Sequence, residues 1–236
     1  MYHSVPAQSG STSSEFALAA PDFRAQVDYL KSAGYHAVLP REVILALDGE
    51  LRLPARAVVF SFDDALQSVY DQAFPVLAQA GYRAVVYVVA GQIGGHNAWD
   101  FGKNVPVESC MDGVALTELL NAGWEIGSHG QTHSDLTKLT SEALLKEVAG
   151  SKADLESRVG LVESFCYPYA AYNSEVRQAV VDAGYTNSAA LYGPTRTVTA
   201  DRFVMKRVFV KGSQGLPTFR RKISRLGLAL RGLRRI

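Results

Sequence analysis

The sequence predicts an α/β fold, specifically a distorted (β/α) barrel of about seven parallel strands with helices outside. Short apolar strands alternate with helical patterns along most of the 236 residues, which is typical of a parallel sheet covered by helices. Glycine is a frequent helix stop. Four expected helices end in Ala-Gly followed by an aromatic residue, at Gly34, Gly81, Gly123 and Gly184. The repetition indicates a series of βα units.

The first expected helix covers residues 22–33, where Phe23, Val27 and Leu30 recur at helical spacing after a Pro-Asp start signal. Later helices are expected over residues 67–80, 114–122, 141–159 and 174–183. Apolar runs predict strands over residues 35–39, 56–62, 84–89, 124–127, 164–167 and 186–191. We expect one domain over residues 1–211 and a basic, amphipathic tail over residues 212–236.

Composition excludes several classes of protein. With 47% apolar and 20% charged residues, the chain can bury a sizeable core, so global disorder is not expected. Cys110 and Cys166 are too few for a disulfide framework or a cysteine-type zinc site. The sequence contains no run of about 18 apolar residues, so a transmembrane helix is not expected. Residues 1–5 do not resemble a secretory signal, which favours the cytoplasm or a peripheral place at the inner membrane.

The tail carries a strong charge asymmetry. Residues 202–236 hold 11 of the 24 Lys and Arg but none of the 23 Asp and Glu, which favours an anionic partner. One helical face of the tail gathers Phe219, Ile223, Leu226, Leu230 and Leu233. Residues 218–236 could therefore lie on an anionic membrane. A final helix packed on the barrel is the alternative. No nucleic-acid partner is expected.

Three polar clusters follow expected strands, and parallel α/β folds place their sites at the carboxyl ends of strands. The first cluster is the pair Asp63 and Asp64, directly after residues 56–62. Adjacent carboxylates repel unless a cation or a shared proton compensates. One could bind a metal while the other acts as a base, although a helix N-cap is a common alternative.

The second cluster contains His129 and His133, after the strand expected at residues 124–127. Histidines four residues apart lie on one helical face, so both imidazoles could reach one ion. Two histidines and one aspartate leave an open coordination position, as catalytic sites do. A chance or surface pair is the alternative.

The third cluster is Phe165-Cys166-Tyr167-Pro168-Tyr169, where a strand runs into a proline that stiffens the loop. On its own, this cluster favours an ordinary strand end with aromatic packing over a functional site.

Together the clusters resemble the motifs of the polysaccharide deacetylases of carbohydrate esterase family 4. Ser61-Phe62-Asp63-Asp64 is similar to the family's Thr-Phe-Asp-Asp motif, and His129 to His133 is similar to its His-x-x-x-His motif. Tyr167-Pro168-Tyr169 resembles the third motif, Arg-x-Pro-Tyr. The resemblance covers roughly residues 1–210.

The resemblance implies one divalent metal ion, Zn²⁺ first, with Co²⁺, Ni²⁺ or Mn²⁺ as alternatives. By resemblance, Asp64, His129 and His133 are the metal ligands and Asp63 is the general base. The backbone N–H of Tyr169 then contributes to an oxyanion hole.

The chain departs from the family pattern at two places. Cys166 stands where the family has the arginine that orients the base, and Arg207 could substitute for it from a later strand, with a surface arginine as the alternative. No histidine follows His133, so the family's C-terminal general acid is missing. The start of the chain, with Tyr2 and His3, resembles a rearranged branch that includes deacetylases of bacterial exopolysaccharides. There the acid is on the first strand, so His3 is the expected acid, against an ordinary first-strand histidine.

Substrate contacts are expected from Trp99, Asp100 and Pro168, since a tryptophan face can stack on a pyranose ring. A core tryptophan is the alternative for Trp99. The expected activity is metal-dependent hydrolysis of N-acetyl groups from amino sugars of an N-acetylated glycan, in the synthesis or modification of a bacterial surface polysaccharide. Two other functions remain open: a catalytically impaired carbohydrate-binding module of the same fold, and an amidohydrolase of a small non-sugar amide.

Overall fold

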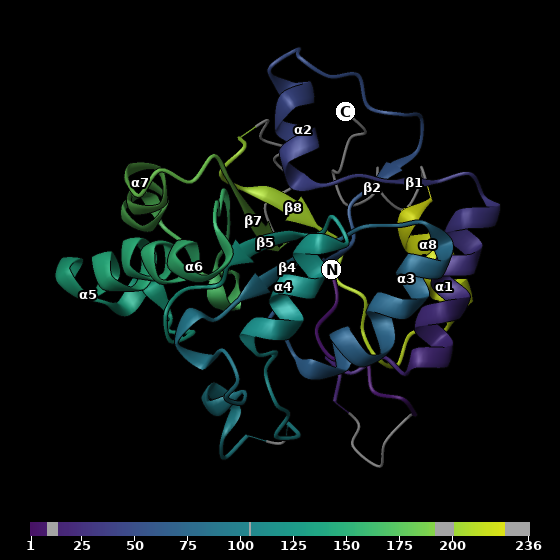
Figure 1. The fold of residues 1–236 in the computed structure, drawn as a ribbon, viewed down its shortest axis with the longest axis horizontal. Coiled ribbons are helices and arrows are strands. Elements are labelled where there is room, and N and C mark those ends of the chain that lie inside the picture. Colours follow the sequence, from purple (N-terminus) through teal and green to yellow (C-terminus); the bar gives the residue numbers. More distant parts are fainter. Residues whose placement is uncertain (9–13, 104, 192–200, 225–236) are drawn as a thin grey trace.

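The computed structural model describes residues 1–8, 14–103, 105–191 and 201–224 (Figure 1). Its centre is one curled sheet of six parallel strands, arranged in chain order. They are β3 (Ser61–Phe62), β4 (Val85–Val88), β5 (Glu125–Ser128), β6 (Ser164–Cys166), β7 (Asn187–Leu191) and β8 (Met205–Arg207). The predicted α/β class and distorted (β/α) barrel are confirmed.

Helices connect the strands and cover the outside of the sheet. They are α1 (Ala20–Ser32), α3 (Phe74–Ala80), α4 (Gly113–Asn121), α5 (Ser141–Leu145), α6 (Ser151–Val159), α7 (Ser174–Asp182) and α8 (Leu216–Ile223). Figure 1 shows α1, α3 and α8 together on one side of the sheet and α5, α6 and α7 on the other. Two of the expected helices contain a π-helical turn, at Val69–Ala73 before α3 and at Lys146–Gly150 between α5 and α6.

The expected strand over residues 56–62 is divided between two sheets. Its first part, β2 (Ala57–Val58), pairs with β1 (His36–Ala37) in a separate two-stranded sheet, and only β3 joins the main sheet. Between β1 and β2 lies α2 (Pro40–Leu47), which the periodicity analysis missed. Its start carries recognisable signals, because Pro40 opens the helix and the Glu42 carboxylate accepts a hydrogen bond from Leu39 N at 2.7 Å.

The first residues close the gap between the two edge strands of the main sheet. On one side, Tyr2 N donates to Ser61 O at 2.9 Å and Asp63 N donates to Tyr2 O at 3.0 Å. On the other side, Met1 N donates to Val208 O at 3.0 Å, and Val210 N donates to Met1 O at 3.1 Å. The N-terminal segment thus occupies the place of a seventh strand and carries His3 to the rim of the barrel.

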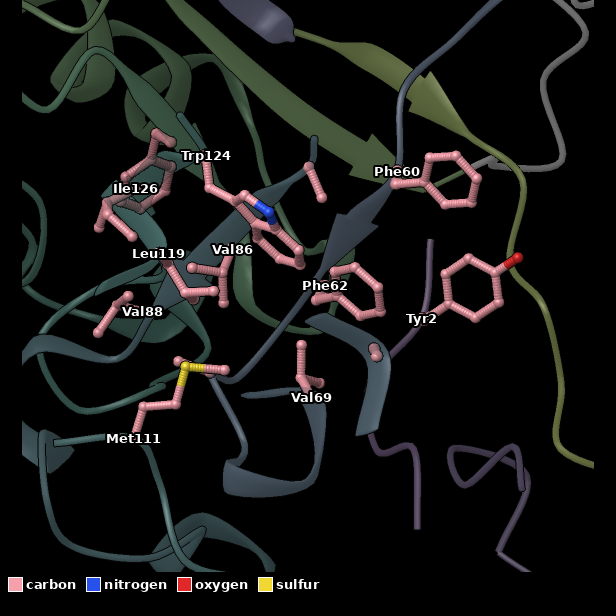
Figure 2. Close-up of a cluster of buried hydrophobic side chains, with 14 of the residues drawn as sticks. Tyr2, Phe60, Phe62, Val69, Val86, Val88, Met111, Leu119, Trp124 and Ile126 are labelled. Atoms are coloured by element: carbon pink, nitrogen blue, oxygen red, sulfur yellow. The ribbon is translucent and has the colours of Figure 1, made fainter. Parts of the chain in front are cut away.

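An aromatic and aliphatic core fills the space between the sheet and the helices (Figure 2). The Phe62 ring stacks on Tyr2 and on Trp124, with ring centroids 5.5 and 5.7 Å apart, so the closing segment is anchored in this core. A smaller apolar cluster contains Val85, Tyr87, Cys166 and Ala189. Gly127 makes this packing feasible, because a Cβ there would lie 2.5 Å from the Tyr87 ring.

The described part of the tail packs on the domain. Phe219 of α8 is buried, and the Arg220 guanidinium lies 4.7 Å from the centroid of the Tyr29 ring on α1. These contacts support the packed-helix interpretation for residues 216–223. Leu226, Leu230 and Leu233 lie outside the described residues, so membrane contact stays a prediction. Among the described residues, no helix has the length and apolarity needed to cross a bilayer.

A buried carboxylate lies at the start of β5. Glu125 is 5% exposed and accepts hydrogen bonds from Ser164 Oγ and, at 3.2 Å, from Arg41 N in the first turn of α2. Burial raises the pKa of Glu125 above its usual range, because the ionised form is poorly solvated there, although the two hydrogen bonds oppose this effect.

The raised pKa predicts the pH dependence of stability. The folded state holds the Glu125 proton more tightly than the unfolded state. The contribution of Glu125 to the free energy of unfolding is therefore fully present below its unfolded pKa and is lost as pH rises through its folded pKa. The free energy of unfolding of Glu125→Gln, relative to that of wild type, should therefore be higher at pH 7.5 than at pH 4. The increase should be about 1.4 kcal/mol per unit of pKa shift. Urea unfolding at both pH values measures this, with exposed Glu142→Gln as control. A difference independent of pH would contradict it.

Candidate active site

The three polar clusters meet at one rim of the sheet because their strands are in register. Val88 of β4 pairs with Ser128 of β5, and Ser128 pairs with Phe165 of β6, so the carboxyl ends lie side by side. A cleft of about 750 Å³ opens at this rim. Among its lining residues are His3, Asp63, Asp64, Trp99, Asp100, His129, His133, Tyr169 and Arg207. Nine of the ten expected site residues therefore line one cleft.

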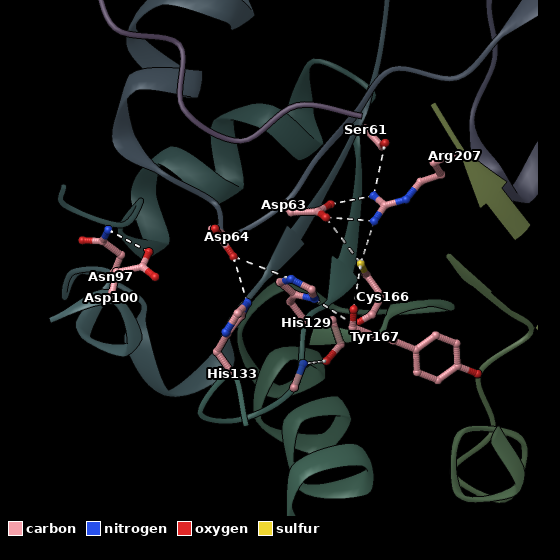
Figure 3. Close-up of polar contacts among 12 residues, drawn as sticks. Ser61, Asp63, Asp64, Asn97, Asp100, His129, His133, Cys166, Tyr167 and Arg207 are labelled. Carbon is pink, nitrogen blue, oxygen red and sulfur yellow. Dashed lines mark hydrogen bonds and ion pairs between the residues drawn. The ribbon is translucent and has the colours of Figure 1, made fainter. Parts of the chain in front are cut away.

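Asp64, His129 and His133 form a buried set suited to a metal ion (Figure 3). Asp64 Oδ1 lies 3.3 Å from His133 Nε2 and 3.6 Å from His129 Nε2. Among the described residues this oxygen is buried and accepts no well-formed hydrogen bond. A carboxylate oxygen left between two imidazole nitrogens fits a divalent cation, and three such ligands leave a coordination position open.

The tautomer of His129 suits metal binding. Its Nδ1 lies 2.7 Å from the carbonyl oxygen of Cys166, which can only accept, so Nδ1 carries the proton and Nε2 keeps its lone pair. Burial lowers the pKa of His129 to about 4, and the neighbouring His133 adds to the effect. The ring is therefore neutral at physiological pH.

The expectation that His129 and His133 share a helical face is wrong. The residues between them form a loop, with Gly130 at φ 81° and His133 itself at φ 64°. The His133 ring is packed between two aromatic side chains. Trp99 stacks on it with centroids 4.6 Å apart, and Tyr169 meets it edge-on at 4.6 Å. The two histidines converge through a left-handed turn and ring packing.

Asp63 is engaged by Arg207 in a bidentate, buried ion pair (Figure 3). Arg207 Nη1 donates to Asp63 Oδ1 at 2.6 Å and Nη2 donates to Oδ2 at 2.8 Å. Nη2 also lies 3.0 Å from Cys166 Sγ. Burial alone would raise the pKa of Asp63, but the charge and hydrogen bonds of Arg207 outweigh it and hold the pKa well below its usual range. Asp63 is therefore ionised.

His3 reaches the cleft from the closing N-terminal segment. Its ring meets Phe16 and Phe209 edge-on, with centroids 4.8 and 5.7 Å away. Its Nδ1 is buried and has no hydrogen-bond partner in the described part of the chain. Ser4, the next residue, is held in place by a hydrogen bond from its Oγ to the Glu108 carboxylate at 2.6 Å. The imidazole is thus held at the cleft by packing against two aromatic rings.

The three expected substrate residues differ in position. Trp99 lines the cleft, although one face is covered by His133. Asp100 lines it too and accepts hydrogen bonds from Asn97 Nδ2 at 3.2 Å and Lys103 Nζ at 3.4 Å. Pro168 is buried and is not one of the described residues that line the cleft, so its contact with a substrate stays a prediction. A Cβ added at Gly130 would lie 3.7 Å from Pro168 Cγ, so this proline packs against the loop between His129 and His133.

Sequence reasoning missed Glu147, whose carboxylate binds the loop between the two histidines. A signal for it exists in the sequence. The apolar face of the helix over residues 141–159 contains Leu144, Val148 and Leu155, and Glu147 adjoins that face. A carboxylate beside a buried helix face needs a polar partner, and the nearby glycine-containing loop supplies it.

Comparisons with known proteins agree with this geometry. A family model described as polysaccharide deacetylase matches residues 51–188. YxkH of Bacillus subtilis, named for the same family, is 26% identical over 186 residues, covering 78% of this chain and 61% of that protein. The poly-beta-1,6-N-acetyl-D-glucosamine N-deacetylase of Staphylococcus epidermidis is 25% identical over 199 residues, covering 80% and 66%. The chain thus spans less than two thirds of the length of either relative.

Solved structures share the fold. The Streptococcus pyogenes deacetylase PplD, solved in complex with acetate, superposes with a TM-score of 0.80 at 19% identity, covering 95% of this chain and 96% of that one. IcaB from Ammonifex degensii superposes with a TM-score of 0.71 at 25% identity, covering 89% of each chain. With more than half of its length matched by the family model, this chain belongs to the polysaccharide deacetylase family.

Proposed function

We propose that this chain is a metal-dependent deacetylase that hydrolyses N-acetyl groups from amino sugars within a polysaccharide. The observation that carries the proposal is that one cleft gathers a buried Asp-His-His set beside a second carboxylate that an arginine keeps ionised. The family supports the reaction, and the Staphylococcus epidermidis relative, named for poly-beta-1,6-N-acetyl-D-glucosamine, supports an N-acetylated polysaccharide as the substrate class.

Asp64, His129 and His133 would hold one divalent cation. Two neutral imidazoles and a carboxylate suit Zn²⁺ first, with Co²⁺, Ni²⁺ and Mn²⁺ as alternatives. When bound, the cation supplies Lewis-acid chemistry: it polarises the acetyl carbonyl and lowers the pKa of a water molecule towards neutrality. The orphaned Asp64 Oδ1 and the fixed tautomer of His129 support this ligand set.

Asp63 is the proposed general base. Its ionised carboxylate takes the proton of the water whose oxygen attacks the acetyl carbon. Arg207 binds both carboxylate oxygens and so fixes the direction in which the base points, the role that the arginine of the third motif has in the family. Cys166, at the motif position, is too short to do this.

The remaining steps need a donor to the developing oxyanion and an acid for the leaving amine. The backbone N–H of Tyr169, in a residue held at φ 56°, is the proposed oxyanion donor. His3 is the proposed acid: it protonates the nitrogen as the C–N bond breaks, which gives acetate and a free amino sugar. Its place in the same cleft as Asp63 and Asp64 supports this role.

The proposal predicts metal-dependent acetate release. A panel of N-acetylglucosamine oligomers with β-1,6 and β-1,4 linkages, the monosaccharide and a small non-sugar acetamide separates the alternatives. We expect hydrolysis of an oligomer that stops after chelation and returns with Zn²⁺, and His129→Ala should abolish it. Oligomer binding without acetate release would indicate a binding module, whereas a preference for the non-sugar amide would indicate a different amidohydrolase.

Asp63 and Arg207 should behave as one unit. Asp63→Asn should retain the metal but lower kcat by about 100-fold or more, the scale of general-base catalysis. Arg207→Met leaves a buried carboxylate unpaired and should cost about 3–5 kcal/mol of stability. The double variant should be more stable than Arg207→Met alone, because its residue 63 is neutral. Urea unfolding of the wild type, the two single variants and the double variant measures the coupling. If the losses in free energy of unfolding of the single variants simply add in the double variant, the pairing is contradicted.

The acid role of His3 is tested by changing the leaving group. His3→Ala should slow amide hydrolysis by about 100-fold, since an amine leaves only when protonated. The same variant should hydrolyse 4-nitrophenyl acetate almost as fast as wild type, because nitrophenolate leaves without a proton. His36→Ala, at an exposed histidine of β1, is the matched control. Equal losses on both substrates would assign His3 a structural role.

A further inference from the structure

We propose that Glu147 is a positioning residue for the metal centre, which sets the place of His133 by holding the main chain of residues 130–132. The inference rests on the proposed metal site. Glu147 is 7% exposed and lies in the π-helical turn Lys146–Gly150 between α5 and α6. Such turns occur often at functional sites.

One carboxylate binds three donors from two consecutive residues of the loop. Glu147 Oε2 accepts hydrogen bonds from Gln131 N at 2.9 Å and from Thr132 N at 3.0 Å. Glu147 Oε1 accepts a hydrogen bond from Thr132 Oγ1 at 2.5 Å. All three contacts lie directly before His133.

The opposite side of the same loop is held by the chain that follows β4. Ala90 N donates to Gly130 O at 3.0 Å, and Gly91 N donates to Gln131 O at 2.9 Å. Gly130, at φ 81°, permits the close approach of Glu147, because a Cβ there would lie 3.0 Å from Oε2. Carbonyls on one side and amides on the other are both hydrogen-bonded, so the main chain of residues 130–132 is held from two sides.

The two histidines of the site are oriented in different ways. The His129 ring is fixed directly by the hydrogen bond of its Nδ1 to Cys166 O. The Nδ1 of His133 is buried without a partner among the described residues. The Trp99 and Tyr169 rings restrict the tilt of His133, but only the backbone can set how far its Nε2 reaches towards Asp64. A shift of residues 131–132 would therefore move this ligand.

The test measures Zn²⁺ affinity rather than turnover. Glu147→Asp keeps the charge but withdraws the carboxylate by one methylene, so it cannot reach both amides. We expect its Zn²⁺ affinity, measured by competition with a chromogenic chelator, to fall by about 10- to 100-fold, the range for residues that orient metal ligands. The Zn²⁺ affinity of Glu147→Ala should fall by a factor in the same range. Glu147→Gln should recover most of the loss, since its amide oxygen can accept from both N–H groups.

Glu142→Asp, on the exposed side of α5, is the matched control and should bind Zn²⁺ as wild type does. Wild-type affinity in a folded Glu147→Asp variant would overturn the inference while leaving the metal site intact. A wild-type protein that binds no divalent metal would instead overturn the proposed function. If Glu147→Ala does not fold, the Asp and Gln variants decide the question, because both retain a polar group facing the loop.

Discussion

The buried ion pair of Asp63 and Arg207 joins the two edges of the sheet as well as two parts of the site. Asp63 directly follows β3 and Arg207 ends β8, and these are the outermost strands of the six. A charge withdrawn from water costs several kcal/mol unless its partner is present, so neither side chain is stable in this interior alone. Asp63 therefore stays ionised in this interior only when both edges of the sheet are in place.

The same pair places an arginine on Asp63 although the third-motif position holds a cysteine. In the family pattern the arginine comes from the position of Cys166, on β6, whereas here it comes from β8, two strands further along the sheet. A small, buried thiol at position 166 leaves space for the guanidinium, whose Nη2 lies 3.0 Å from Sγ. The requirement is for a bidentate donor at one point in space, and parallel strands that share a rim offer several routes to it.

The alternation of strands and helices was predictable because it depends on local patterns of apolar residues and glycine stops. The division of residues 56–62 between two sheets was not, since an apolar run carries no mark of its partner strand. The spacing of His129 and His133 indicated that the two side chains share one site, but it did not give their geometry, because the left-handed backbone of His133 (φ 64°) leaves no mark in the local sequence. The role of Glu147 was not predicted either, because the partners of its hydrogen bonds are in a loop 15 and 16 residues away in the sequence.

The N-terminal segment that closes the barrel also has a consequence for biosynthesis. It is translated before every strand of the main sheet, and its Met1 N donates a hydrogen bond to Val208 O, 207 residues later. Contacts between such distant parts of a chain form late, because loop closure costs entropy before the contact repays it. Until β8 leaves the ribosome, both edges of the sheet present unpaired amides and carbonyls, the kind of surface that joins with other chains. Termination of the chain before β8 would thus leave the main sheet open at the edge of β7, a surface prone to aggregation.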